Sequence, residues 1–110
     1  MLGGVFLPSS AASTTSTAAT TRVTVKASEF KFVFSRRSVP TGTVIFTVVN
    51  SGHVSHDFKI AGKKTRVLIH GESQKLTVKI LKKGRYAFLC TLLGHADAGM
   101  KGKYAVGVSP

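Results

Sequence analysis

The 110-residue sequence has few acidic residues and almost no cysteine, and both shortages exclude classes of protein. Its single cysteine, Cys90, cannot form an internal disulfide, which excludes a disulfide-stabilised scaffold. The apolar opening MLGGVFL is too short for a transmembrane helix, which needs about 20 apolar residues. Only 4 residues are Asp or Glu against 16 Lys and Arg, for a formal net charge of +12. Such an excess bears on partners and solubility rather than on the fold.

The basic residues are spread along the chain instead of forming one tail. Since no long basic run occurs, a localised nucleic-acid-binding tail is not expected. Phe30 and Phe32 flank Lys31, but their strand phase points them to the core rather than to bases. Two kinds of partner for the basic surface remain, an acidic protein surface and an anionic membrane surface. The alternative is that the positive charge only keeps the surface solvated and binds no partner.

The first 21 residues differ in composition from the rest. The apolar opening is followed by PSSAASTTSTAATT, in which every residue after the proline is Ala, Ser or Thr. Such a stretch buries too little apolar surface to order itself, so we expect a signal remnant or flexible linker at 1–21 and one domain at 22–110. Ser9 and Ala11 would suit a signal cleavage point, and we expect an exported, periplasmic or extracytoplasmic domain that this segment could tether to a membrane.

Apolar residues alternate with period two from residue 22 onward, which predicts strands. The clearest sets are Val23, Val25 and Ala27; Phe30, Phe32 and Phe34; and Leu76, Val78 and Ile80. Residues 43–50 are apolar on both faces like a central strand, and 55–62 and 65–69 are expected to be strands as well. Only the loop 94–99 could hold a helical turn. Seven or eight short strands indicate an all-β sandwich or small barrel.

Strand phase places three metal-binding side chains on the inward face. Cys90 is in phase with Tyr86 and Phe88 at the end of one strand. His56 shares the phase of Phe58 and Ile60, and Met100 that of Tyr104, Val106 and Val108. His95 lies in the loop that joins Cys90 to Met100, so the four side chains converge if these strand ends share one rim.

Each of these residues alone has a plain structural explanation, as a buried hydrophobe, a core filler or a satisfied polar pair. Together they form a set suited to copper, because thiolate and thioether favour Cu(I) while imidazole also serves Cu(II). Two His, one Cys and a long axial Met mark blue-copper electron-transfer sites. Four residues separate Cys90 from His95 and four more separate His95 from Met100, with Gly94 and Gly99 relieving the turns.

These stretches resemble the cupredoxins, the azurin and plastocyanin type of single-domain blue copper proteins. VPTGTVIFTVVNSGHVSHDFKIAG resembles the family's first-histidine segment, and GRYAFLCTLLGHADAGMKGKYAVGV its Cys, His and Met segment. The resemblance covers residues 22–108 and implies a Greek-key fold and one Cu(I)/Cu(II) ion. Its implied ligands are the equatorial His56, Cys90 and His95 and the axial Met100. His53 is a rival for the first position, but strand phase and the following Asp57–Phe58 favour His56.

By resemblance, the chain is a type 1 electron carrier and a monomer, not an enzyme. The electron would leave through the edge of His95, and partners would be redox proteins with acidic docking surfaces, such as a c-type cytochrome or a terminal oxidase. A small apolar docking patch would consist of Leu92, Leu93, Ala96, Ala98 and Gly99. The chain departs from the family in lacking a proline between Cys90 and His95 and in having Asp57 where Asn is usual. Asp57 could still accept a bond from Thr91, and its charge would lower the reduction potential.

Other functions fit the same residues less well. A copper carrier or storage domain could use the four ligands without electron traffic, but the inward phase of Cys90 argues against exchangeable ligation. Zinc could bind Cys90, His56, His95 and Asp97, which leaves Met100 without a role. A Cys–His nucleophile pair has no accompanying oxyanion hole. A metal-free binding module is the remaining alternative.

Overall fold

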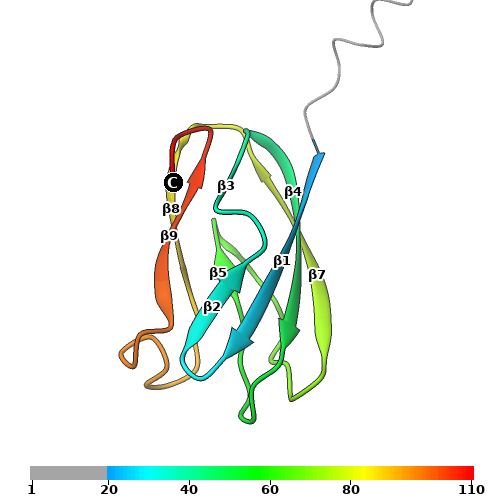
Figure 1. The fold of residues 1–110 in the computed structure, drawn as a ribbon, viewed down its shortest axis with the longest axis vertical. Helices are drawn as coiled ribbons and strands as arrows, with labels where there is room; N and C mark the ends of the chain where they lie inside the picture. The colour runs from blue at the N-terminus through cyan, green and yellow to red at the C-terminus, as the bar shows by residue number, and fades with distance from the viewer. Residues whose placement is uncertain (1–19) are drawn as a thin grey trace, which may run out of the picture.

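The computed structural model describes residues 20–110, which form a β-sandwich of two mixed sheets (Figure 1). The segment 1–19, and with it nearly all of the predicted linker, lies outside the described range. The described strands are β1 (Thr20–Ser28), β2 (Lys31–Phe34), β3 (Ser38–Val39), β4 (Gly42–Asn50), β5 (Lys59–Ile60), β6 (Lys63–Lys64), β7 (Ser73–Ile80), β8 (Gly84–Leu89) and β9 (Lys101–Val106). Within residues 20–110 we find no helix, and therefore none able to span a membrane.

Along the chain, the strands alternate between the two sheets. One sheet has the order β2-β1-β4-β7, with β1 and β4 parallel and the other pairs antiparallel. The other has the order β3-β9-β8-β5-β6, with β3 and β9 parallel. The chain therefore crosses between sheets several times, and the predicted all-β sandwich is confirmed.

The core follows from the period-two pattern of the long strands. Buried residues alternate with exposed or half-buried ones along β1, β4 and β7, so one face of each strand is apolar. The fully buried aromatic rings of Phe46 and Phe58 pack with centroids 5.5 Å apart between the sheets. Phe34 stacks on Tyr104 at 4.7 Å and extends this aromatic core toward the edge strand β2.

The ends of the strands were predicted less accurately than their centres. Phe30 was expected in the core, but it is 39% exposed because it lies in the turn before β2, where strand phase no longer applies. The predicted strand 55–62 keeps regular pairing only at β5, and the predicted strand 65–69 keeps one isolated bridge between Leu68 and His56. The loop 94–99 does contain a helical turn, closed by the Ala98 N–H donating to the Gly94 carbonyl.

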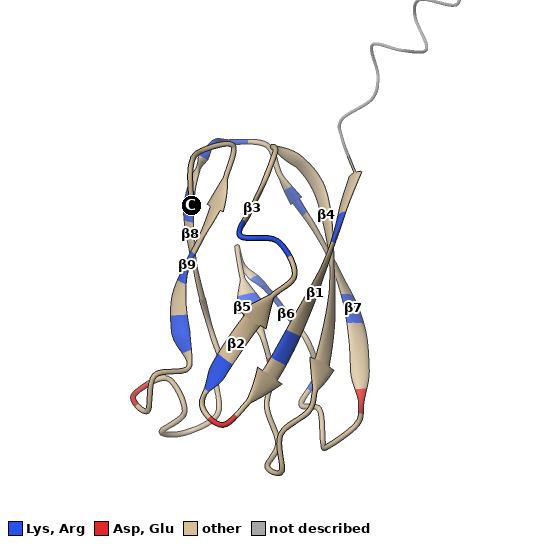
Figure 2. Ribbon diagram, viewed as in Figure 1, with Lys and Arg blue, Asp and Glu red and all other residues tan. Residues whose placement is uncertain are grey.

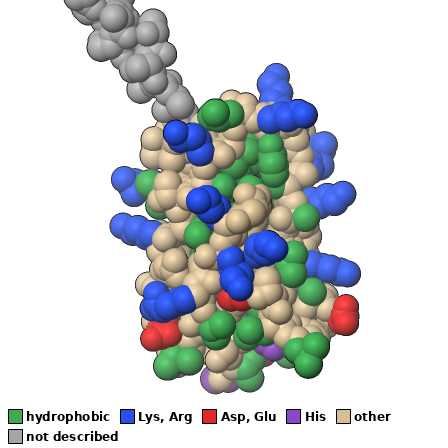
Figure 3. Space-filling model, turned by 180° about the vertical axis from the view of Figure 1, so that it is seen from behind, with side chains coloured by type: hydrophobic (Ala, Val, Ile, Leu, Met, Phe, Trp, Pro, Cys, Tyr) green, Lys and Arg blue, Asp and Glu red, His purple; other side chains and the backbone are tan. Residues whose placement is uncertain are grey.

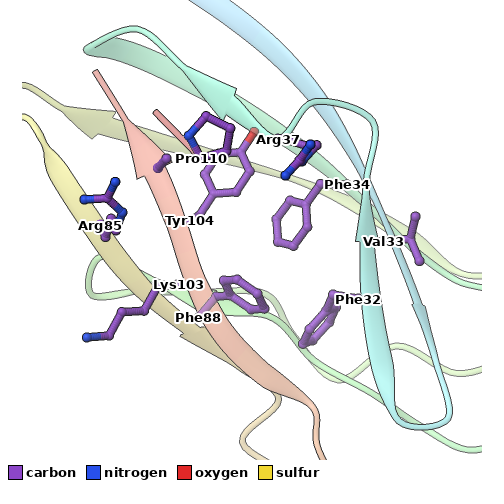
Figure 4. A pocket seen from close by; sticks show the side chains of 10 residues that line it. Phe32, Val33, Phe34, Arg37, Arg85, Phe88, Lys103, Tyr104 and Pro110 are labelled. Carbon is purple, nitrogen blue, oxygen red and sulfur yellow. The ribbon is translucent and has the colours of Figure 1, made fainter. Parts of the chain in front are cut away.

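A hollow of about 430 Å³ opens where the edge strand β2 parts from β8 and β9 (Figure 4). Phe32, Phe34, Phe88 and Tyr104 line its floor, and Arg37, Arg85 and Lys103 also border it. None of the four candidate copper ligands lines this hollow. The candidate site is instead in the loops at the lower end of the sandwich in Figure 1.

Candidate metal centre

Three of the four predicted ligands meet at the end of the sandwich. Cys90 follows β8 directly and His95 lies in the loop that leads to β9. His56 comes from the connection between β4 and β5, where its backbone bridges Leu68. The donor atoms of His56, Cys90 and His95 all lie within 4.8 Å of one another. The fold thus brings His56 to Cys90 and His95, which lie 34 and 39 positions further along the sequence.

The two imidazoles present the same nitrogen to this point. His56 Nδ1 and His95 Nδ1 are 3.2 Å apart, and Cys90 Sγ is 3.4 Å from His95 Nδ1. His56 and Cys90 are fully buried, whereas His95 is half-buried and so reaches the surface. Met100 is also fully buried and belongs to a small cluster with Ala27 and Cys90. A soft thioether therefore lies in the same apolar cluster as the thiol.

Backbone hydrogen bonds fold the loop between Cys90 and Met100 back on itself. The Cys90 N–H donates to the Met100 carbonyl, and the Met100 N–H donates to the His95 carbonyl, each at 3.1 Å. Gly94 has a φ of 82°, a left-handed conformation that glycine adopts without steric cost. The loop thereby returns His95 beside the sulfur, as its spacing predicted.

The sulfur of Cys90 is fully buried and accepts hydrogen bonds from the backbone. The Asp57 N–H points to Cys90 Sγ at 3.5 Å. Burial raises the pKa of the Cys90 thiol, because a thiolate is poorly solvated there, and this backbone hydrogen bond partly offsets the effect. A metal ion that binds at this thiol would therefore displace its proton.

Asp57 connects the His56 segment to the Cys90 loop. Its carboxylate accepts the Thr91 N–H at 2.6 Å and also the Thr91 hydroxyl. The bond from Thr91 that the sequence predicted is therefore present, although aspartate stands where the resembled family usually has asparagine. Because Asp57 is buried, these two bonds hold together the segments that carry His56 and Cys90.

A carboxylate that was not predicted to belong to the site orients His56. Glu29, in the turn between β1 and β2, accepts a hydrogen bond from His56 Nε2 at 2.8 Å. It also accepts the backbone N–H groups of His53 and Val54. The His53 N–H, and after it the His56 ring, lower the pKa of Glu29 from 4.5 to about 2. Because the anionic Glu29 can only accept, Nε2 carries the proton and Nδ1 is left as the donor atom for a metal.

The only sequence signal for Glu29 was its rarity. It is one of 4 acidic residues and lies at the parity switch between two predicted strands. Its partner His56 is 27 positions away, so nothing local marked the contact. Gly52 lies against the same pair and leaves no room for a side chain, since an added Cβ would clash with Glu29 Oε1 and would also be 3.1 Å from His56 Nε2.

An apolar surface surrounds the exposed edge of His95. Phe30 packs edge-on against the His95 ring, with centroids 5.1 Å apart. Leu93, in the same loop as His95, is fully exposed, and Val54 is 44% exposed. Figure 3 shows hydrophobic and histidine side chains together at this lower end. Phe30 was expected in the core, and it belongs instead to this surface.

The rival His53 does not join the cluster. It is exposed and stacks against the similarly exposed His70. Asp97, the fourth ligand of the alternative zinc site, is exposed and is not part of the three-donor group. The donors at this end are thus two imidazoles, one thiol and a thioether, which is the donor chemistry of blue copper rather than of structural zinc.

Comparison with known proteins confirms the cupredoxin-like fold. The family model described as the cupredoxin-like domain matches residues 1–106. No curated protein sequence matches the chain. Among solved structures, auracyanin B has a TM-score of 0.66 at 23% identity and covers 82% of this chain and 89% of its own. Reduced auracyanin from Roseiflexus castenholzii has a TM-score of 0.62 at 22% identity, with coverage of 84% and 98%.

An enzyme domain shares the same fold. The copper-containing nitrite reductase from Thermus scotoductus has a TM-score of 0.63 at 20% identity and covers 80% of this chain. The match takes in only 28% of the nitrite reductase chain. At these identities the structural likeness establishes the fold and no more.

Proposed function

The chain belongs to the cupredoxin-like domain family, and from this premise we propose that it is a blue copper protein that carries single electrons between redox partners. The observation that carries the proposal is the convergence of one buried cysteine and two histidines within 4.8 Å. Copper held there would supply one-electron exchange between Cu(I) and Cu(II).

Four residues would hold the ion, each prepared by its own neighbours. Cys90 offers Sγ, and the Asp57 N–H stabilises negative charge on that sulfur. His56 offers Nδ1 because Glu29 holds the proton on Nε2. His95 offers Nδ1 from the folded loop, and Met100 offers its thioether from the buried cluster. Since three of these side chains are fully buried, they have little freedom to rearrange between oxidation states.

The half-buried His95 is the proposed route for the electron, because its ring is the ligand that reaches the apolar surface. We propose Leu92, Leu93, Ala96, Ala98 and Gly99 as the docking patch, with Phe30 added at its edge. The net charge of +12 supports partners with acidic surfaces, such as a c-type cytochrome or a terminal oxidase domain. Export to the periplasm, and attachment to an anionic membrane, belong to the same proposal.

The proposed role is transfer rather than catalysis. A copper enzyme needs an open coordination position for its substrate. Here the thiol, both imidazoles and the thioether occupy a site whose only half-exposed member is His95. A copper carrier or storage domain remains the second candidate, because the same donors would hold copper without electron traffic.

The visible spectrum of the purified protein after addition of Cu(II) tests the copper site. We expect an intense blue thiolate-to-copper band that disappears on reduction and is absent in Cys90→Ser. Asp97→Asn, in the same loop but outside the donor cluster, is the matched control and should stay blue. A colourless wild type, or a weak band that survives Cys90→Ser, would contradict the proposal.

Electron self-exchange and copper exchange separate the two candidate roles. For an electron carrier we expect fast self-exchange by NMR line broadening and slow loss of copper to a chelator. Leu93→Glu should slow electron transfer while leaving the blue band unchanged, because Leu93 is fully exposed and contributes no donor. Fast copper loss combined with slow self-exchange would favour the carrier or storage role.

A further inference from the structure

Two histidines at the same end of the sandwich take no part in the candidate copper site. His53 is in the exposed connection after β4, and His70 is in the turn before β7. Their rings are parallel within 3° and their centroids are 5.7 Å apart. Neither histidine donor belongs to the group formed by His56, Cys90 and His95. The described residues thus contain a second pair of neighbouring imidazoles.

A backbone contact determines the tautomer of His70. Its Nδ1 lies 2.6 Å from the Gly52 carbonyl, which can only accept a hydrogen bond. Nδ1 must therefore carry the proton, and Nε2 of the neutral ring is left with a free lone pair. Histidines that bind metals usually donate their other ring N–H to a carbonyl or carboxylate in this way. His70 is thus prepared as a metal ligand while it is exposed to solvent.

The backbone that carries His53 is also held in place. Glu29 accepts the His53 N–H with both carboxylate oxygens at 3.1 Å. Asn50 is buried and binds the Gly52 N–H through its side-chain oxygen at 2.8 Å. The Asn50 side-chain amide donates to the carbonyls of Val54 and Leu68. The segments that present the two imidazoles are therefore joined to each other before any ion arrives.

The spacing of the rings suits a shared ion. Two imidazoles bound to one ion at about 2.0 to 2.1 Å have ring centres roughly 4.5 to 6.5 Å apart, depending on the angle between the two bonds at the ion. The His53–His70 separation of 5.7 Å lies in this range, and the His56–His95 pair in the candidate copper site has 5.0 Å. The parallel rings must rotate out of their stack before a nitrogen of each can face one ion, and both side chains are exposed and free to do so.

The local charge also favours a cation, despite the positive charge of the whole chain. Figure 2 shows the acidic residues at this end of the sandwich, with Lys and Arg along its body. Glu29 binds the His53 backbone, and Glu72 follows His70 by two positions. These carboxylates reduce the repulsion that a divalent ion would meet elsewhere on the surface.

We propose that His53 and His70 form a second, solvent-exposed site for a divalent transition-metal ion, with Cu(II) as its preferred occupant. Cu(II) is preferred because nitrogen donors bind it more strongly than the other first-row divalent ions. Water would complete its coordination, since the two rings are the protein donors at this position. The site does not depend on the proposed electron-transfer role, and each can fail without the other.

Counting bound copper tests the second site. The wild-type protein, already loaded with one equivalent, is given a second equivalent of Cu(II), passed through a desalting column, and analysed for metal and by electron paramagnetic resonance. We expect two bound ions, the second with a wider copper hyperfine splitting than a thiolate site and with coupling to nitrogen. His53→Ala and His70→Asn should each bind one ion fewer and leave the first signal unchanged.

The choice of variants keeps the test specific. His70→Asn retains a side-chain donor for the Gly52 carbonyl but lacks Nε2, so a loss of copper in this variant is not a loss of loop structure. Lys75→Ala, an exposed change on β7, is the matched control and should keep both ions. A wild type that retains no second ion would overturn the proposal, and so would a second ion that survives in the protein carrying both His53→Ala and His70→Asn. The count stays decisive even if the first site is not blue.

Discussion

Two carboxylates hold the segments that carry the candidate ligands. Asp57 is buried, and it binds Thr91 next to Cys90. Glu29 is partly exposed, with 29% of its side chain accessible, and it orients His56. At the scale of single residues, the site is therefore defined as much by these acids as by its donors. Because both carry negative charge beside the proposed copper, both would stabilise the oxidised ion.

Asp57→Asn tests the contribution of this charge. Asparagine keeps an oxygen that can accept the Thr91 N–H, so the loop should hold its position. We expect the reduction potential to rise on the order of 50 to 100 mV, because the buried charge that favours Cu(II) is lost. The measurement is a potentiometric titration of the blue band. The exposed Asp97→Asn is the comparison, and an equal rise in both variants would argue against a specific effect of Asp57.

The loop between β8 and β9 is the element that assembles most of the site. It supplies Cys90, His95 and Met100, and its own backbone hydrogen bonds return the last of these to the first. The family's usual proline is absent between Cys90 and His95. The helical turn from Gly94 to Ala98 provides the internal constraint in its place.

Substitution of Gly94 tests whether this conformation is needed. An added Cβ would have no heavy atom within 4 Å, so the cost of Gly94→Ala comes from the left-handed φ of 82° alone. We expect Gly94→Ala to lower the free energy of unfolding by about 1 to 2 kcal/mol, and Gly94→Asn by less, because asparagine visits this region more readily. Urea unfolding measures both. Equal losses in the two variants would point to a cause other than backbone strain.

Several of the strands were predictable because their pattern is local. The alternation that buries Val23, Val25 and Ala27 is visible in the sequence and is present in β1. The short strands β3 and β6 were not predicted, because a strand of two residues has no period. Their pairing depends on neighbours that other parts of the chain supply.

Across the whole molecule, β9 connects the two sheets through Tyr104. Its hydroxyl donates to the Arg36 carbonyl, in the link between β2 and β3, at 2.7 Å. The same ring stacks on Phe34 of the opposite sheet. Burial raises the pKa of Tyr104 from 10.0 to about 12, and the nearby charge of Arg36 offsets only part of this effect.

The raised pKa predicts a loss of stability in alkali. Since the folded-state pKa lies above the unfolded one, the contribution of Tyr104 is complete below about pH 10 and declines as the pH rises toward about 12. We expect the free energy of unfolding to fall more steeply over this range in the wild type than in Tyr104→Phe. Urea unfolding at several pH values, followed by circular dichroism, measures the two slopes. Parallel slopes would contradict the assignment, because the titrating lysines are common to both proteins.

The sequence by itself determined the fold class and the four candidate donors. Both rest on local properties, because period-two alternation predicts strands, strand phase selects His56, Cys90 and Met100, and His95 lies in the loop between the last two. The order of Cys90, His95 and Met100 within one loop needed no knowledge of distant contacts.

Tertiary structure decided which surroundings these donors receive. It brought Glu29 to His56 across 27 residues and so set which nitrogen of His56 faces Cys90. It also set His53 against His70. These contacts are made by loops. No periodic sequence pattern predicts the conformation of a loop, because it depends on hydrogen bonds from remote parts of the chain. The candidate donors can therefore be predicted from the sequence, whereas their orientation and electrostatic environment arise only when the sheets bring the loops together.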